Sequence, residues 1–398
     1  MIEKYYSGVI EQIYNRIGKE TRNIVMANYS NDFSIENLEV IRRYQSNEDN
    51  VFFAYSEFSY NTLVGAYEPF LDIICNMHRR FIGGSFDDFQ KECGVYYLHR
   101  QVLNSYYETG ECFREETVLL NEVAYEQRRM TMAIADMLKK LSEVKPLMIV
   151  INRFQMASKS SIETIKYLID NPCANIGIVL GVNAIVKGTD STVEVWDRIV
   201  ESLEDRSAIY YIGSAGPLKN NVKTTNDDEL YITMNFEQSI QEASNIMEFL
   251  DFEQARRGCR IIEHKLKFED AWIDEKSLRR FYMVYARTSV LLGEMSKAIE
   301  LTNEYKALIP ENDSEHYLSL YYFMKGTCYM YQGKLEKAGN SAKSAYDYAV
   351  LAEDDTLIFK AELLSVMIKM SGWYNIFFCV QDIPVSDEII EMLIKHGY

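Results

Sequence analysis

The stretch PLMIVINRFQMAS, Pro146 to Ser158, decides how the first half of the chain folds. Its apolar run LMIVI, residues 147–151, is short, rich in β-branched side chains and flanked by polar residues. A run of this kind predicts a strand that is buried on both faces. Such strands are typical of a parallel sheet that is covered by helices.

Four further apolar runs in the first 216 residues have the same character. They predict strands at residues 23–27, 51–56, 176–182 and 208–213. Segments with helical periodicity lie between the predicted strands, at residues 34–45, 67–81, 131–144 and 160–171. Strand and helix in alternation predict an α/β domain at residues 1–216, with a parallel P-loop-type sheet and flanking helices.

The charge and composition of the chain argue against some classes of partner. The formal net charge of −17 argues against binding of nucleic acid or of an anionic membrane by this segment. No window approaches the roughly 18 uninterrupted apolar residues of a membrane span. The seven cysteines are dispersed and form no CxxC pair, which predicts reduced thiols in a cytoplasmic protein. We expect neither a metal site nor a cofactor.

The pattern of apolar residues changes after residue 216. Residues 217–234 are polar and turn-rich, which predicts a linker. Beyond it, the segment LLGEMSKAIELTNEYKALIP, residues 291–310, is echoed by YQGKLEKAGNSAKSAYDYAV, residues 331–350. Related segments at 249–266 and at 370–380, the latter around Gly372, fit the same template.

Small residues recur in register within this repeat. Gly293 matches Gly333 and Ala298 matches Ala338, in both cases 40 residues apart. Small side chains let paired helices approach closely, and glycine suits the turn between them. The pattern resembles the tetratricopeptide repeat and predicts an all-α tetratricopeptide-like solenoid at residues 235–398. Because the chain ends in what reads as the first helix of another repeat, we expect a C-terminal truncation.

The residues that would bind a nucleotide do not match the required chemistry. A P-loop needs glycines and a lysine directly after its strand, whereas NYSNDFSIENL, residues 28–38, contains neither. Magnesium needs carboxylates at the end of a buried strand, and this position holds an amide and a guanidinium. We therefore predict a degenerate nucleotide pocket without catalysis, formed by Asn28, Ser30, Ser34, Asn152 and Arg153.

Four segments resemble one family in the same order along the chain. They are YEPFLDIICNM (67–77), KPLMIVINRFQMASKSSIETIKYLI (145–169), NIGIVLGVN (175–183) and AIYYIGSAGPL (208–218). Together they resemble the ATPase module of STAND signalling proteins, the signal-transduction ATPases with numerous domains. That family includes LuxR-family transcriptional regulators of the maltose-regulator type, with repeats after the ATPase module. The resemblance implies a bacterial sensor or scaffold that controls an attached output.

The repeats are the expected place for a protein or small-molecule effector. The repeat register assigns a concave face to Arg280, Met283, Arg287, Phe323 and Thr327. Arginines there suit an acidic peptide or a small anion, but pairing with nearby acids explains them equally well. Met and Phe at helical spacing are more often core than binding surface. Self-association through the repeats is left open.

Three functions remain compatible with the sequence. The leading hypothesis is a non-catalytic sensor or scaffold in a signalling or transcriptional regulator. An active ATPase with non-standard nucleotide ligands is the second. The third is a plain protein-interaction adaptor, or the regulatory part of a nucleotide-cyclase or diguanylate-cyclase protein.

Overall fold

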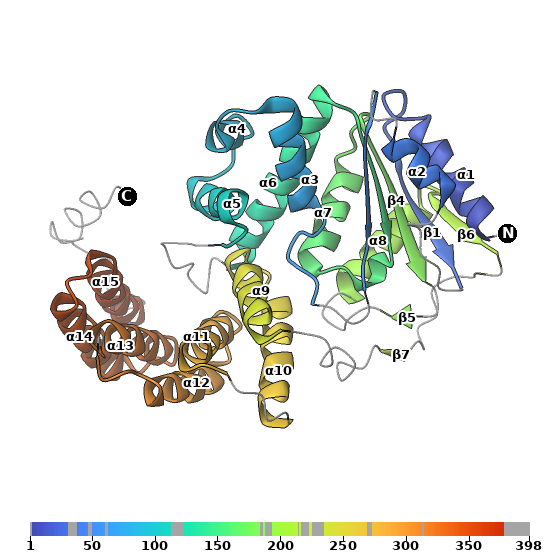
Figure 1. Cartoon of the computed structure of the whole chain (residues 1–398). Helices are drawn as coiled ribbons and strands as arrows, with labels where there is room; N and C mark the ends of the chain where they lie inside the picture. The colour runs from blue at the N-terminus through green and yellow to red at the C-terminus, as the bar shows by residue number, and fades with distance from the viewer. Residues whose placement is uncertain are drawn as a thin grey trace. The chain divides into compact units, whose positions relative to one another are not determined.

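A five-stranded parallel sheet forms the centre of the first half of the chain (Figure 1). Its strands are β1 (Ile24–Tyr29), β2 (Phe52–Glu57), β3 (Leu147–Asn152), β4 (Ile176–Asn183) and β6 (Ile209–Ile212), in the order β2-β3-β4-β1-β6. Every pairing in this sheet is parallel. All five predicted strands are therefore confirmed, and β1 extends two residues beyond the predicted run.

The sheet is covered on both faces, as the apolar run of β3 indicates. Every residue of β3 and of β4 is buried, so neither face of these strands meets solvent. One face packs against α1 (Ile2–Tyr14) and α2 (Glu39–Gln45) in a single apolar cluster. Figure 1 shows α7 (Lys159–Asp170) on the opposite side of the sheet, and its predicted apolar face is buried.

The computed structural model describes most of the chain. The described residues are 2–30, 38–46, 50–59, 63–112, 123–183, 186–187, 193–213, 215, 223–224, 235–268, 273–312 and 314–377. The other elements of the first half are α3 (Phe70–Met77), the π-helix η1 (His78–Ile82), α4 (Phe86–Glu92), α5 (Tyr97–Thr109), α6 (Val123–Val144), the 3-10 helix η2 (Phe154–Met156) and α8 (Val193–Glu204). A small parallel pair joins β5 (Val186–Lys187) to β7 (Lys223–Thr224), which lies within the predicted linker.

The chain divides into two compact units at a later point than the predicted linker. The units are Met1–Ala271 and Trp272–Tyr398, so α9 (Phe236–Glu248) and α10 (Phe252–Phe268) belong to the first. Polar contacts between distant segments explain this division. The Asp251 carboxylate accepts a hydrogen bond from the backbone of Ser160 at 3.0 Å, and the Gln254 amide donates to the Val64 carbonyl at 3.0 Å.

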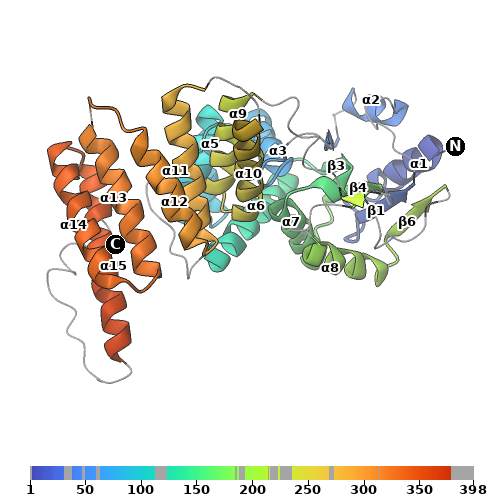
Figure 2. The same ribbon diagram turned by 90° about the horizontal axis from the view of Figure 1, so that it is seen from below.

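The second unit is entirely helical in its described part. It consists of α11 (Glu275–Leu291), α12 (Met295–Ala307), α13 (Ser314–Tyr331), α14 (Leu335–Leu351) and α15 (Asp355–Phe377), which Figure 2 shows side by side. Gly293 and Gly333 have φ values of 77° and 71° in the turns after α11 and α13. Ala298 and Ala338 are fully buried, as expected for positions where helices approach closely.

One expected repeat turn is wrong. The sequence pattern placed a turn around Gly372, but α15 continues through this residue to Phe377. Glycine costs only about 1 kcal/mol in a helix interior, so a single glycine does not end a helix that packing holds in place. The segments beyond residue 377, including the predicted start of a further repeat, lie outside the described residues.

Two composition-based predictions can be compared with the fold. Six cysteines lie in the described part of the chain, and all six are free thiols. No helix in the described ranges combines the length and apolar character needed to cross a membrane.

Candidate functional site

The connections of the sheet create a topological switch between β1 and β4. The next strand of this sheet after β1 is β2, at one edge, whereas the next after β4 is β6, at the other edge. Open α/β sheets bind ligands at the carboxyl ends of the strands beside such a switch. This end of the sheet is therefore where a nucleotide would be expected.

Buried side chains of the chain itself meet at this end of the sheet. Tyr29, at the end of β1, donates a hydrogen bond to Asn152 Oδ1, at the end of β3, over 2.5 Å, and both residues are fully buried. The Tyr6 side chain enters from α1. A Cβ atom added to Gly181 of β4 would lie 2.8 Å from Asn152 Oδ1 and closer still to Tyr6 Oη. The tyrosines and the amide thus meet above a strand position that has room only for glycine.

The charge of Arg153 is neutralised by Glu57 at the same end of the sheet. Arg153 Nη1 lies 3.0 Å from Glu57 Oε1 and also donates to the Phe58 carbonyl at 3.2 Å. Glu57 ends β2 and pairs in register with Asn152, so parallel alignment brings it to this position. Burial, followed by the negative charge of Glu57, raises the pKa of Tyr6, which keeps its phenol neutral. Because Arg153 is paired with Glu57, the two side chains together offer no net positive charge to a phosphate.

The predicted nucleotide pocket is partly assembled. Asn28, Asn152 and Arg153 lie at the same end of the sheet, and Asn28 is 1% exposed. Ser30 follows β1 and is half-buried, whereas Ser34 lies outside the described residues. Ser158 has a structural role, because its Oγ accepts a hydrogen bond from the Ser161 backbone at the start of α7. Sequence reasoning missed Tyr6, Tyr29 and Glu57. Tyr29 and Glu57 are the last residues of β1 and β2, and Tyr6 reaches β4 from α1.

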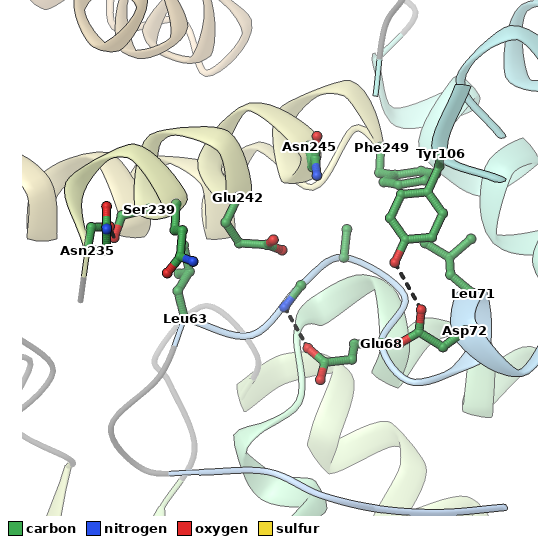
Figure 3. A pocket seen from close by; sticks show the side chains of 13 residues that line it. Leu63, Glu68, Leu71, Asp72, Tyr106, Asn235, Ser239, Glu242, Asn245 and Phe249 are labelled. Atoms are coloured by element: carbon green, nitrogen blue, oxygen red, sulfur yellow. Dashed lines mark hydrogen bonds between the residues drawn. The ribbon is translucent and has the colours of Figure 1, made fainter. Parts of the chain in front are cut away.

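A second site lies elsewhere in the first unit, in a cavity of about 460 Å³ beside α3, α5 and α9 (Figure 3). Its wall combines apolar, amide and acidic side chains. The lining residues are Leu63, Gly65, Ala66, Glu68, Leu71, Asp72, Tyr106, Asn235, Gln238, Ser239, Glu242, Asn245 and Phe249. We call it the acidic cavity, because three carboxylates line it and none of the described lining residues is basic.

The sequence YEPF builds one wall of the acidic cavity. Tyr67 is buried with φ 57°, and its backbone N–H donates to Ser160 Oγ at 3.0 Å. The helix α3 then begins at Phe70, which places Glu68 just before the helix and Asp72 in its first turn. The opposite wall is α9, whose start is capped by the Asn235 side chain.

The three carboxylates differ in their partners. Glu68 Oε2 accepts a hydrogen bond from the Gly65 backbone at 2.9 Å, and Asp72 Oδ1 accepts one from Tyr106 Oη at 3.0 Å. Glu242 has no hydrogen bond or ion pair with the described part of the chain. A Cβ added to Gly65 would lie 2.9 Å from Glu242 Oε1 and 3.4 Å from Glu68 Oε2, so both carboxylates converge on one point. Figure 3 shows Glu242 extending from α9 toward the segment that carries the other two.

Burial and mutual repulsion perturb these acids. The pKa of Glu242 is raised to about 7, first by burial and then by the charges of Glu68 and Asp72. Burial also raises the pKa of Glu68, and the hydrogen bond from Gly65 offsets part of this increase. The pKa of Tyr106 is raised by burial and by the adjacent Asp72. The acidic cavity is therefore a place where added positive charge would be stabilised.

The residues of the predicted concave face in the second unit differ in how far they are exposed to solvent. Arg280 is exposed, whereas Met283, Arg287 and Phe323 are half-buried. Thr327 is buried and donates to the Phe323 carbonyl one turn earlier at 2.9 Å. Phe323 also packs partly against the apolar cluster formed by α13, α14 and α15. Phe323 and Thr327 thus contribute to packing, which the sequence left open as the alternative.

Sequence patterns alone did not identify the acidic cavity. The YEPF stretch stood out in the sequence only through its family resemblance. Its glutamate, Glu68, lines the same cavity as Glu242 because of the fold, since the two residues are far apart in the sequence. Comparisons with protein-family models, with curated proteins and with solved structures found no match.

Proposed function

We propose that this chain is the non-catalytic sensor or scaffold part of a signalling or transcriptional regulator. In this proposal the α/β unit no longer hydrolyses nucleotide, and the helical unit binds a protein or small-molecule effector. The proposal rests on the end of the sheet rather than on any relative of the chain.

One observation carries the proposal: the buried hydrogen bond between Tyr29 and Asn152 at the switch between β1 and β4. Hydrolysis needs a carboxylate-held metal and a polarised water at this end of the sheet. The chain has instead a neutral amide that is already bonded to a buried phenol, and an arginine that is bonded to Glu57. Phosphate binding would require the Tyr29–Asn152 hydrogen bond and the Arg153–Glu57 ion pair to be broken, which would leave buried polar groups without these partners.

The helical unit supports the second half of the proposal. Helices that pack in succession along the chain present continuous surfaces on which a partner can dock. The arrangement of α11 to α15 is of this general kind, with Arg280 exposed and Arg287 half-buried along one helix. Because the chain as a whole carries a net charge of −17, such arginines would be distinctive recognition points.

A phosphate-release assay tests the absence of catalysis. The full chain is incubated with Mg·ATP, and release of inorganic phosphate is followed at several protein concentrations. The proposal predicts no release that rises with protein concentration. Release that scales with the wild-type chain and disappears in an Asn152→Leu variant would instead support the alternative of an ATPase with unusual ligands.

A further inference from the structure

We propose that the acidic cavity binds a small organic cation, an amine or guanidinium carried on a short, partly apolar skeleton. This inference concerns a different site from the end of the sheet. It therefore stands whether or not the chain binds nucleotide.

The first argument is the balance of charge. Glu68, Asp72 and Glu242 face one cavity, and the described residues that line it include no Lys, Arg or His. Glu68 and Asp72 are each hydrogen-bonded by the protein, whereas Glu242 has no such partner among the described residues. A partly buried carboxylate without a partner is costly, and a bound cation would supply the missing donor and charge.

The second argument is the placement of the acceptors. Glu242 Oε1 and Glu68 Oε2 converge beside Gly65, where the absence of a side chain lets both approach the backbone. An ammonium group has three N–H donors and a guanidinium has five, so either can serve several acceptors at once. Glu242 and the second oxygen of Glu68 would accept from such a group, as charge-assisted hydrogen bonds.

The third argument distinguishes an organic cation from a metal ion. A metal site requires its ligands to converge within about 2–2.6 Å of one point. No group of acidic, histidine or cysteine side chains in the described residues has the arrangement for holding a metal ion. Glu242 and Glu68 approach each other beside Gly65, whereas Asp72 is held separately by Tyr106, so the three carboxylates do not form one ligand set. They line a cavity of about 460 Å³, a size typical of small-molecule sites.

The fourth argument is the apolar part of the wall. Leu63, Leu71 and Phe249 line the cavity, and the Tyr106 ring lies edge-to-face with Phe249 at a centroid distance of 5.5 Å. This surface would contact the hydrocarbon skeleton of a ligand, and aromatic faces attract cationic groups. The combination of acidic and apolar wall selects an amine that carries carbon chain over an inorganic cation.

Calorimetric titrations of the full chain at pH 8 test the proposal. The probes are 1,5-diaminopentane, agmatine and the neutral analogue 1,5-pentanediol, which has the skeleton of the diamine but no charge. The variant Glu242→Gln removes the partnerless charge and keeps the side-chain shape. The matched control is Glu237→Gln, because Glu237 is exposed on the same helix and does not line the cavity.

The proposal predicts saturable binding of at least one of the two amines and none of the diol. Glu242→Gln should weaken amine binding by roughly tenfold or more, as for loss of a hydrogen bond to a charged group. Glu237→Gln should change it less than twofold. The proposal is overturned if neither amine binds, if the diol binds as well as the diamine, or if both variants weaken binding equally. Circular dichroism of each variant shows that the fold is retained.

Discussion

Tyr29 and Asn152 are joined by a hydrogen bond although their strands are not neighbours. β4 lies between β1 and β3, and the bond of 2.5 Å passes over its residue Gly181. The side chains on either side can meet because this position lacks a Cβ atom. The contact links β1 to β3 across β4, at the end of the sheet where a ligand would otherwise be expected.

Substitution of Gly181 tests the importance of this arrangement. We expect Gly181→Ala to lower the free energy of unfolding by about 2–3 kcal/mol, because a Cβ would displace Asn152 and Tyr6 in a buried environment. Gly8→Ala on α1 is the control, since a Cβ there meets nothing within 4 Å. Helix propensity predicts that this control gains about 0.5–1 kcal/mol. Urea unfolding measures both values, and equal effects of the two variants would refute the crowding argument.

The ion pair of Arg153 with Glu57 should stabilise the same end of the sheet. The two side chains are only 19% and 16% exposed. We expect Arg153→Ala to cost about 2 kcal/mol, below the range for fully buried pairs, because it leaves a carboxylate without its cation. The double variant Arg153→Ala/Glu57→Gln should recover part of this loss. If the double variant were less stable than the single one, the two residues would not act as a pair.

The acidic cavity makes stability depend on pH. The pKa of Glu242 is about 7 in the folded chain, against an ordinary value of 4.5. The folded state therefore binds more protons than the unfolded state between these values, and this group lowers the free energy of unfolding as the pH rises from about 4.5 to 7. Three other titratable groups line the cavity: Glu68, Asp72 and Tyr106. The charges of Glu68 and Asp72 add to the increase in the pKa of Glu242.

Removal of the Glu242 charge should abolish the contribution of this group to the pH dependence. We expect Glu242→Gln to be more stable than the wild type by about 1–2 kcal/mol at pH 8, a value reduced for partial exposure, and nearly equal to it at pH 4.5. Thermal unfolding at the two pH values gives the comparison. Glu237→Gln, which is exposed, should show the same difference from wild type at both pH values. A gain for Glu242→Gln that is equally large at pH 4.5 would contradict the electrostatic explanation.

Two glycines of the helical unit should respond oppositely to alanine. A Cβ on Gly326, in α13, would lie 2.9 Å from Leu364 Cδ2 of α15 and 3.3 Å from Ser341 Cβ of α14. We expect Gly326→Ala to destabilise the unit by about 1–3 kcal/mol through overpacking. On Gly339, in α14, a Cβ meets nothing within 4 Å, so Gly339→Ala should stabilise by about 0.5–1 kcal/mol. Denaturant unfolding that ranked the two variants in the opposite order would contradict the close approach of α13 and α15.

Local sequence patterns predicted the sheet because its strands are short and continuously apolar. LMIVI could be recognised as a buried strand since burial of both faces leaves no polar alternation. The division between units could not be read in this way. It depends on contacts such as Asp251 with Ser160, which join residues far apart in the sequence through buried backbone groups.

The site residues show the same limit. The missing P-loop residues and the amide at Asn152 were visible in the sequence, whereas the bond from Tyr29 requires the strand order. Likewise, Glu68 and Glu242 are ordinary acidic residues in the sequence. Their significance depends on α9 lying opposite the YEPF stretch, which no local pattern encodes.

Calorimetric titration of the full chain with Mg·ATP tests the central claim most directly. If the buried Tyr29–Asn152 contact closes the nucleotide end of the sheet, the titration should give only the heat of dilution up to millimolar ATP. A saturable isotherm with a dissociation constant in the micromolar range would contradict the account.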